Sequence, residues 1–316
     1  MCRANTVLYP PIYHKSTQLV STYAQLGYKA PMKIPKRLQP LVEDGLIDDV
    51  IRQLMSGKEA TVYVVRCGSE IRCAKVYKES NKRSFKKAVQ YQEGRKVRNS
   101  RRARAMEKGS RFGRDEQEQS WQTAEIDALR RLAEAGVRVP KTYCCIDGVL
   151  LMELITDADG YVAPRLADAE MSVEIALEDH AMLMRYITRM LCAGLVHGDL
   201  SEFNVLVDEH GPVIIDLPQA VDAAANNHAE RMLTRDVNEI RDYYALYAAE
   251  LKNTQYAKEI WALYENGELH ADVELSGRFE DDSSAADVDG VLDEIKAAWQ
   301  EEQDRLLRIS DAELDT

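Results

Sequence analysis

The chain has no apolar run long enough to span a membrane, and its first fifteen residues lack the continuous apolar stretch of a secretion signal. We therefore expect a cytoplasmic protein without membrane contact. Cysteine is also scarce, with six residues in 316 and no C-x-x-C pair. This usage predicts reduced, free thiols and no structural zinc site.

The chain has no excess of positive charge either, because 53 acidic residues outnumber 41 basic ones and the formal net charge is −12. This balance argues against a general nucleic-acid-binding protein. The charge is unevenly spread, however, since residues 82–114 hold thirteen Lys and Arg but only two Glu, a local charge of +11. The segment is poor in apolar residues and contains three glycines, so we interpret it as a basic, flexible insertion.

Hydrophobic residues make up 45% of the chain, which is enough for a sizeable core, and their spacing predicts the order of the elements. Short apolar runs bounded by turn residues predict strands at 60–65, 71–76, 144–146 and 149–154. Helical spacing predicts helices at 41–55, 120–135, 177–191 and 236–251. This order is typical of an α+β fold with a sheet-rich first lobe and a mostly helical second lobe.

Composition divides the chain into four parts. Residues 1–40 contain five prolines and are predicted to form an extension. We assign the first lobe to residues 41–156, with the basic insertion inside it, and the second lobe to residues 157–265. Residues 266–316 follow as a tail that is acidic after Phe279 and then helical in pattern.

Three polar residues, Asp199, Asn204 and Asp216, stand at short intervals in strongly apolar sequence. Two predicted strands, 205–207 and 213–215, would bring these side chains to one end of a hairpin. Each residue alone is an ordinary turn or capping residue, whereas the ordered set is what phosphoryl transfer needs. One carboxylate accepts the hydroxyl proton, while an amide and a second carboxylate hold a metal against the phosphates. We therefore expect a phosphotransferase that uses ATP with Mg²⁺, or with Mn²⁺ in its place.

The same order is found in protein kinases, where H-R-D-x-x-x-x-N precedes D-F-G. Here residues 197–199 read His-Gly-Asp, and residues 216–218 read Asp-Leu-Pro. Asp199 is then the candidate catalytic base, and Asn204 and Asp216 are the candidate metal ligands.

A candidate phosphate loop precedes the first predicted strand at Ser56, Gly57, Lys58, Glu59 and Ala60. Glycine with small neighbours lets backbone amides approach phosphate oxygens, although a Ser-Gly pair is equally typical of an ordinary turn. The segment matches neither G-x-x-x-x-G-K-[ST] nor G-x-G-x-x-G, so on its own it predicts little.

Lys75 lies in an apolar strand, the second after this loop, which is the place of the strand lysine in kinases. Glu125 lies on the following predicted helix, on the side of Ala128 and Leu132. We expect Lys75 and Glu125 to pair, so that the ammonium is directed toward the phosphates. The alternatives are a solvent-facing strand lysine and a solvated helix glutamate.

The last strand of the first lobe runs through Met152, Glu153, Leu154 and Ile155. In this arrangement adenine would hydrogen-bond to backbone groups near Glu153 and Ile155, and Met152 would line the pocket. A core-filling role for Met152 fits the sequence equally well.

The chain resembles the RIO family of atypical protein kinases, in the branch without an N-terminal winged helix. The resemblance covers roughly residues 50–245. It is carried by Trp121 followed by Glu125 and by the segments at 56–60, 74–77, 197–204 and 215–220. The most specific part reads LVHGDLSEFN, followed by IIDLPQAV. The resemblance implies a two-lobed protein-kinase-like fold with a shortened second lobe, ATP with magnesium, and transfer to serine.

The resemblance also implies the site roles given above, and it adds Asp236, which would brace the catalytic loop. Between Asp216 and Asp236 there is no room for a long activation loop, and no A-P-E motif is present. We therefore expect neither regulation by phosphorylation of such a loop nor binding of an extended peptide.

Three functions remain open. The first is a serine/threonine protein kinase, including autophosphorylation, with Ser84, Ser100 and Ser110 of the insertion as candidate acceptors. The second is an ATPase switch in small-subunit assembly, for which the insertion would contact RNA or a ribosomal particle; a solvated loop is an equal interpretation. The third is a small-molecule phosphotransferase, although those enzymes usually have I-D-W or I-D-F where this chain has Asp216-Leu217-Pro218. The sequence does not identify a protein substrate.

Overall fold

The computed structural model describes three stretches of the chain, residues 32–57, 59–78 and 111–279. In the third stretch the side chains are described from Thr123 onward. The chain divides into two units, the second of which begins at Phe279, and every described helix and strand belongs to the first. Among these described residues, no helix is both long and apolar enough to cross a membrane.

Several predictions fall outside these stretches. They concern the extension before residue 32, Lys58, the basic insertion as far as residue 110 with its three serines, the side chain of Trp121, and the tail after Phe279. The described part of the predicted tail, residues 266–279, forms turns and irregular backbone and contains no helix.

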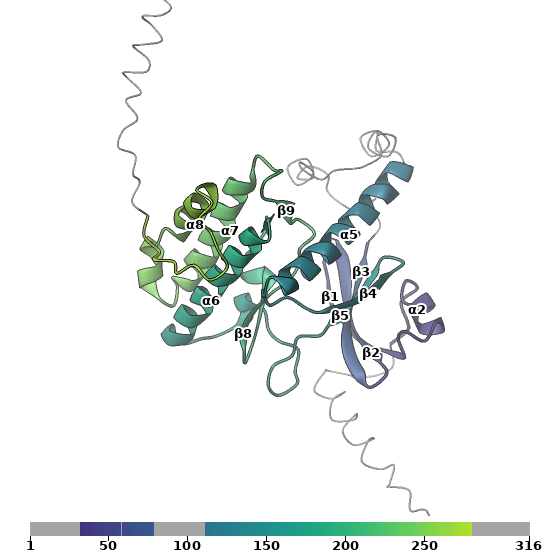
Figure 1. Cartoon of the computed structure of the whole chain (residues 1–316). Helices are drawn as coiled ribbons and strands as arrows, with labels where there is room; N and C mark the ends of the chain where they lie inside the picture. The colour runs from purple at the N-terminus through teal and green to yellow at the C-terminus, as the bar shows by residue number, and fades with distance from the viewer. Residues whose placement is uncertain (1–31, 58, 79–110, 280–316) are drawn as a thin grey trace, which may run out of the picture. The chain divides into compact units, whose positions relative to one another are not determined.

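The first lobe is built on a five-stranded antiparallel sheet in the order β1-β2-β3-β5-β4 (Figure 1). The strands are β1 Asp49–Ser56, β2 Ala60–Cys67, β3 Glu70–Tyr77, β4 Thr142–Ile146 and β5 Val149–Glu153. The four strands predicted for this lobe are confirmed to within two residues at each end. Gly68, with a φ of +64°, makes the tight turn from β2 to β3.

Strand alternation gives the two faces of the sheet different partners. On one face, Ala74 of β3 packs in a core cluster that includes Leu41 of the short helix α2 (Gln39–Glu43). On the other face, Tyr77 packs in the main core with residues of the long helix α5 (Arg111–Glu134). Lys75, two residues before Tyr77, shares this second face and is directed toward α5.

The prediction of a helix at 41–55 is wrong. Helix α2 ends at Glu43, Gly45 takes a φ of +72°, and the chain enters β1 at Asp49. The apolar residues of this segment fit a helical stripe and a strand about equally, and such short runs are ambiguous by periodicity alone. Pairing of β1 with β2 along the sheet decides the outcome.

The second lobe is mostly helical, as predicted. Its α-helices are α6 Val173–Cys192, α7 Ala229–Tyr244 and α8 Tyr256–Glu265, and its 3₁₀ helices are η3 Leu166–Asp168, η4 Glu202–Asn204 and η5 Ala249–Asn253. Two small antiparallel ladders pair β6 Leu195–Val196 with β9 Val221–Asp222, and β7 Val205–Asp208 with β8 Gly211–Ile214. Helix α7 begins seven residues before its predicted start, and α8 was not predicted.

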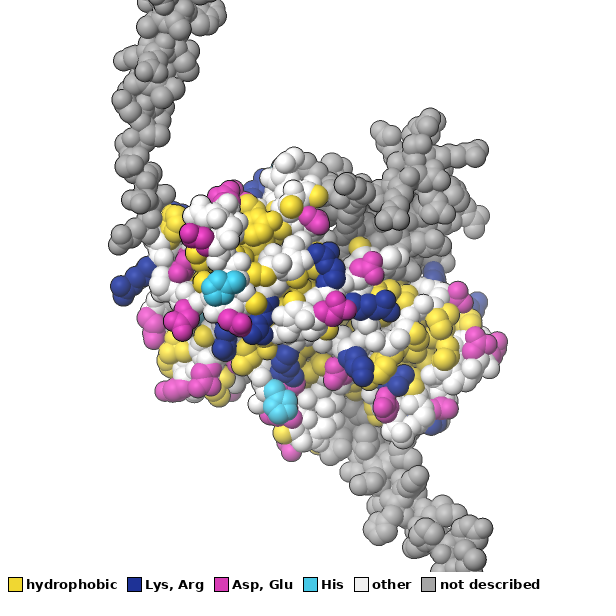
Figure 2. Space-filling model, viewed as in Figure 1, with side chains coloured by type: hydrophobic (Ala, Val, Ile, Leu, Met, Phe, Trp, Pro, Cys, Tyr) yellow, Lys and Arg dark blue, Asp and Glu magenta, His cyan; other side chains and the backbone are white. Residues whose placement is uncertain are grey.

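Helix α6 delivers the chain into the loop of the catalytic motif. Ser172 caps its first turn, accepting a hydrogen bond from the Ile175 N–H at 3.3 Å, and Gly194 with a φ of +73° follows its end. Its buried face joins the main core with α5, α7 and α8. On the surface, acidic and basic side chains are interspersed over the face shown in Figure 2.

Candidate active site

Lys75 is held between two carboxylates that come from distant parts of the chain. Its Nζ lies 2.6 Å from Glu125 Oε1 on α5 and 2.6 Å from Asp216 Oδ1 beyond β8. The side chain of Lys75 is 9% exposed and that of Glu125 is 2% exposed, whereas Asp216 remains 46% exposed. The structure thus brings the predicted Lys75–Glu125 pair together and adds Asp216 to it.

The two carboxylates compensate for the burial of the ammonium. Burial alone lowers the pKa of Lys75, but the charges of Glu125 and Asp216 outweigh it and raise the pKa above its ordinary value. For Asp216, desolvation raises the pKa, but the Lys75 ammonium, with a contribution from Arg165, lowers it below its ordinary value. Lys75 and Asp216 are therefore both charged at neutral pH.

Tyr77 fixes the second oxygen of Glu125. Its hydroxyl donates a hydrogen bond of 2.5 Å to Glu125 Oε2, so that both carboxylate oxygens are bound by side chains of β3. Sequence analysis did not include Tyr77 in the site. Tyr77 lies two residues after Lys75 and therefore on the same face of the strand. This spacing is a signal in the sequence from which Tyr77 could have been predicted as a site residue.

Asp216 stands two residues beyond the end of β8, where the backbone leaves the strand direction. Its φ of +66° is uncommon for a residue with a Cβ, and such conformations gather at functional sites. The Ile215 N–H just before it donates to the Asn204 carbonyl at 3.0 Å. This local bend carries the Asp216 carboxylate to Lys75.

The loop from His197 to Asn204 is held by bonds between its side chains and the backbone. Asn204 Nδ2 donates to the Asp199 carbonyl at 2.7 Å, which leaves Asn204 Oδ1 as an acceptor. The Asp199 N–H donates to His197 Nδ1 at 3.3 Å, and His197 Nε2 lies 3.1 Å from the Ile215 carbonyl. These contacts require a neutral ring with its proton on Nε2, and burial favours it by lowering the pKa of His197.

Asp236 on α7 braces the loop from His197 to Asn204, as the resemblance implied. Its carboxylate accepts hydrogen bonds from the N–H groups of Gly198 at 2.7 Å and Leu200 at 3.2 Å. Arg235 donates to the Gly198 carbonyl and, at 3.3 Å, to Asp236 Oδ1. Burial raises the pKa of Asp236 to about 7, although Arg235 and the two N–H donors lower it.

The predicted phosphate loop is the turn between β1 and β2. The Gly57 N–H donates to the Ala60 carbonyl at 2.9 Å. Lys78, just after β3, donates from Nζ to Ser56 Oγ at 2.9 Å and to the Gly57 carbonyl at 2.5 Å. No motif in the sequence pointed to Lys78, because its contact with the loop depends on the pairing of β2 with β3.

The predicted adenine-binding residues lie where the chain passes from the first lobe to the second. Met152 is partly buried and packs against the main core, so core packing alone accounts for it. The Glu153 N–H donates to the Lys141 carbonyl at 2.8 Å, and the Ile155 carbonyl accepts from the Ala163 N–H at 3.0 Å.

Within the described stretches, no group of three or more His, Cys, Asp or Glu side chains could hold a metal ion. Asn204 and Asp216 offer an amide oxygen and a carboxylate, which are hard oxygen ligands. Mg²⁺ commonly binds to one or two carboxylates and completes its shell with water and substrate phosphates. The residues therefore fit a metal held jointly with a nucleotide and do not fit a dedicated protein cage.

Comparison with known proteins agrees with this geometry. A family model described as the RIO domain matches residues 61–259. The RIO-type serine/threonine-protein kinase Rio1 of Haloferax volcanii is 34% identical over 213 residues, which cover 66% of this chain and 68% of the relative. The corresponding figures for the protein of the same name from Methanocaldococcus jannaschii are 30% over 194 residues, with 60% of each chain covered.

Eukaryotic relatives are longer than the matched region. The serine/threonine-protein kinase RIO1 of Caenorhabditis elegans is 30% identical over 212 residues, which cover 65% of this chain but 38% of the relative. The match with this relative therefore covers less than half of its length.

Proposed function

The chain belongs to the RIO domain family, and on this premise we propose that it is a serine/threonine-protein kinase that transfers the γ-phosphoryl group of ATP to a hydroxyl, including its own. The observation that carries this proposal is the buried Lys75 ammonium between Glu125 and Asp216, 2.6 Å from each. A fixed cation beside a half-exposed carboxylate is what phosphate and its metal require. The printed names of the relatives support the same activity.

Asp199 is the proposed base. In the transfer step the acceptor hydroxyl oxygen forms a bond to the γ-phosphorus, the bond from that phosphorus to the bridging oxygen breaks, and ADP leaves. The hydroxyl proton passes to the Asp199 carboxylate. Asn204 and Asp236 support this role, because their hydrogen bonds to the backbone on both sides of Asp199 restrict the loop.

Asn204 Oδ1 and Asp216 Oδ2 are the proposed metal ligands. Asn204 Nδ2 donates to the Asp199 carbonyl, and Asp216 Oδ1 accepts from Lys75, which leaves the amide oxygen of Asn204 and the second carboxylate oxygen of Asp216 as the ligands. A bound Mg²⁺ would neutralise charge on the phosphates.

The turn between β1 and β2 is the proposed phosphate loop, and the segment after β5 is the proposed adenine site. Among the described residues, a Cβ at Gly57 would meet only the Ala60 carbonyl, at 3.7 Å, so contacts with this part of the chain do not require glycine there. Close approach of a phosphate gives a reason for it. Adenine would form hydrogen bonds with the Glu153 carbonyl and the Ile155 N–H. The Glu153 N–H already binds the Lys141 carbonyl, and the Ile155 carbonyl already accepts from the Ala163 N–H.

The test is incubation of the purified protein with γ-labelled ATP and Mg²⁺, for wild type beside Asp199→Ala. We expect hydroxylamine-resistant label on serine or threonine of wild type, and loss of label in Asp199→Ala while ATP binding is retained. No label on either residue type, in this chain or in added protein substrates, would refute the kinase proposal.

An ATPase switch is the second candidate, and the short connection after Asp216 favours it. Residues 221–222 already pair with β6 as strand β9, and α7 begins at Ala229, so the described second lobe offers no long activation segment to support a peptide. We propose that such a switch would act on a ribosomal particle through the basic insertion. Release of free phosphate with little stable label on protein would favour this candidate over the kinase.

A further inference from the structure

Two arginines cross between α5 and α6, and each bonds to a backbone carbonyl at the C-terminal end of the other helix. Arg131 of α5 donates from Nη2 to the carbonyl of Ala193, the C-cap of α6. Arg189 of α6 donates from Nη1 to the Gly136 carbonyl, 2.9 Å away and just beyond the end of α5. These two contacts form what we call the arginine clamp.

Both helix ends are shaped to receive an arginine. Gly136 and Gly194 follow their helices with φ values of +74° and +73°, where a residue with a Cβ is disfavoured. A Cβ at Gly136 would lie 3.2 Å from Arg189 Nη1, and one at Gly194 would lie 3.3 Å from Arg131 Nη2. Because a helix C-terminus carries partial negative charge, each guanidinium is also stabilised electrostatically.

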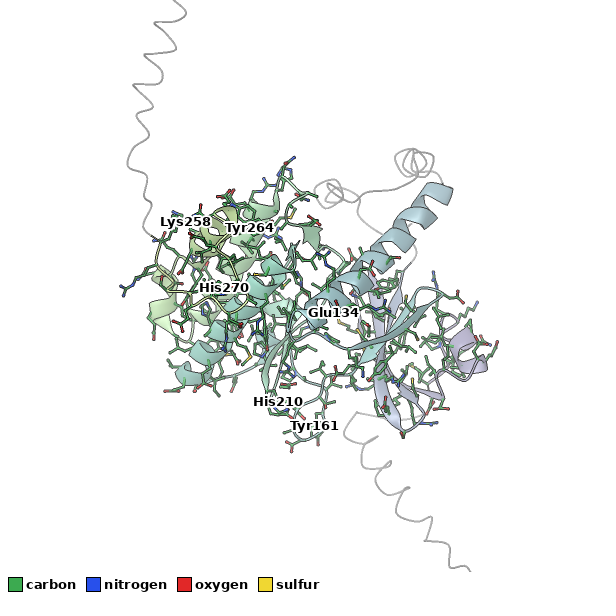
Figure 3. All side chains as sticks on the ribbon, in the orientation of Figure 1. Glu134, Tyr161, His210, Lys258, Tyr264 and His270 are labelled. Atoms are coloured by element: carbon green, nitrogen blue, oxygen red, sulfur yellow. The ribbon has the colours of Figure 1, made fainter. Side chains whose placement is uncertain are left out.

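Arg189 has further partners in the segment after α8. Its Nη2 lies 3.1 Å from Asp272 Oδ1, and its Nε lies 3.4 Å from the Ala271 carbonyl. Figure 3 labels Glu134, the last residue of α5, and His270, which directly precedes Ala271 in the chain. One side chain therefore joins the end of α5, helix α6 and the segment after α8.

The clamp lies equally close along the chain to two residues of the candidate active site, Glu125 and Asp199. Arg131 follows Glu125 by six residues on α5, and Ala193 precedes Asp199 by six residues. Six helical residues rise about 9 Å, less than two turns. Since one uninterrupted helix contains both Glu125 and Arg131, a shift of α5 at the clamp displaces Glu125 from Lys75.

We propose that Arg131 and Arg189 are positioning residues for phosphoryl transfer. By tying α5 to the start of the catalytic loop, they hold Glu125 and Lys75 in register with Asp199. The activity part of this proposal rests on the proposed kinase function. Without the clamp, α5 keeps its core contacts through Leu129 and Leu132, so the helix shifts but does not unfold.

The experiment compares Arg131→Ala and Arg189→Ala with matched controls on the same helices, Arg130→Ala and Arg185→Ala, which remove exposed arginines. For the clamp variants we expect kcat to fall about tenfold with a smaller change in the KM for ATP. The controls should stay within about twofold of wild type. Arg189→Lys should recover part of the loss, because an ammonium can still bond to a carbonyl.

A double-mutant cycle tests whether the clamp acts through Glu125. In a Glu125→Gln background, Arg189→Ala should reduce kcat much less than it does in wild type, because the position of Glu125 no longer matters. Hydrogen exchange supplies a readout that needs no activity. Amides of residues 125–134 should exchange faster in Arg189→Ala and at the wild-type rate in Arg185→Ala.

The outcomes separate the two proposals. Equal kcat in clamp and control variants, or full multiplicative losses in the Glu125→Gln background, would overturn the positioning role. If wild type itself transfers no phosphate, the kinase proposal fails. Hydrogen exchange alone then tests whether the clamp holds α5 to the start of the catalytic loop. Faster exchange limited to the clamp variants would then support it, and unchanged exchange would overturn it.

Discussion

The two halves of the candidate active site are held by different forces. In the first lobe, Lys75 and Glu125 are fixed by a buried ion pair between side chains 50 residues apart. In the second lobe, the loop around Asp199 is fixed by neutral and charged side chains that bond to its backbone, chiefly Asp236 and Asn204. The first half therefore depends on charge balance, while the second depends on the path of the backbone.

This difference also predicts how substitutions in each half should affect stability and activity. A buried ion pair that loses one member leaves an uncompensated charge, which is strongly destabilising. A loop that loses one brace keeps its other bonds and becomes less well positioned. The first half should therefore fail in stability and activity together, and the second should fail mainly in activity.

The largest expected effect is that of Lys75→Met. Glu125, 2% exposed, would lose the ammonium that compensates for its burial, so we expect the free energy of unfolding to fall by about 3 kcal/mol. The double variant Lys75→Met/Glu125→Gln should recover part of this stability and still transfer no phosphate. Urea denaturation of the three proteins measures the effect, and a double variant no more stable than the single one would contradict the charge-balance account.

The next effect is that of Asp236→Asn. The amide has one acceptor oxygen where the carboxylate has two, so one of the two N–H groups loses its partner, and we expect a loss of about 2 kcal/mol in stability. Transfer should slow at saturating ATP while the affinity for ATP stays the same, because the bonds of Asp236 go to the N–H groups on both sides of Asp199. An equal loss of ATP affinity would show that the two halves are not separable in this way.

Asp236 also predicts a pH dependence in the second half. Its pKa is about 7 in the folded protein and near 4 when unfolded, so the folded state binds the proton more tightly. Its contribution to stability is present below the unfolded pKa and is lost as pH rises through the folded one, by roughly 1 kcal/mol between pH 6 and pH 8. Transfer should rise over this window, since the ionised form binds the loop amides. Unfolding curves and rates at pH 6, 7 and 8 should show both trends in wild type and neither in Asp236→Asn.

Tyr77→Phe should have the smallest effect. It tests how much the Tyr77 hydroxyl contributes to holding Glu125 in the first half of the site. It removes one neutral donor from Glu125 and leaves the Lys75 ion pair intact, so we expect a loss of about 1 kcal/mol. Thermal and urea unfolding would measure it, with activity within a few-fold of wild type. A loss as large as that of Lys75→Met would mean that the hydroxyl, rather than the charge balance, holds Glu125.

The second half was readily predicted from the sequence because its parts are close along the chain. Asp199, Asn204 and Asp216 fall within eighteen residues, and two short strands bring them together. The first half needed a pairing over 50 residues, and it was predicted only because a strand lysine and a helix glutamate stood in the expected order. The helix predicted at 41–55 failed because strand pairing overrode local periodicity.

Contacts without a motif could not be predicted from the sequence. Lys78 reaches the phosphate loop only through the pairing of β2 with β3, and the exchange between Arg131 and Arg189 depends on how two helix ends meet. Lysines and arginines that a sequence pattern places at the surface are common on helices and strands. Nothing in the neighbouring sequence distinguishes Lys78, Arg131 and Arg189 from them. Each of them bonds to at least one backbone carbonyl, a group that every residue carries.

The most direct test of the proposed site is a paired measurement of Mg²⁺-dependent ATP affinity and single-turnover phosphate transfer in Asp199→Asn and Asp216→Asn. We predict that Asp199→Asn binds ATP as wild type does and loses transfer by about a thousandfold, because it lacks only the base. Asp216→Asn should lose both transfer and Mg²⁺-dependent affinity. Wild-type transfer in either variant, or the same loss of affinity in both, would contradict the roles assigned to these two carboxylates.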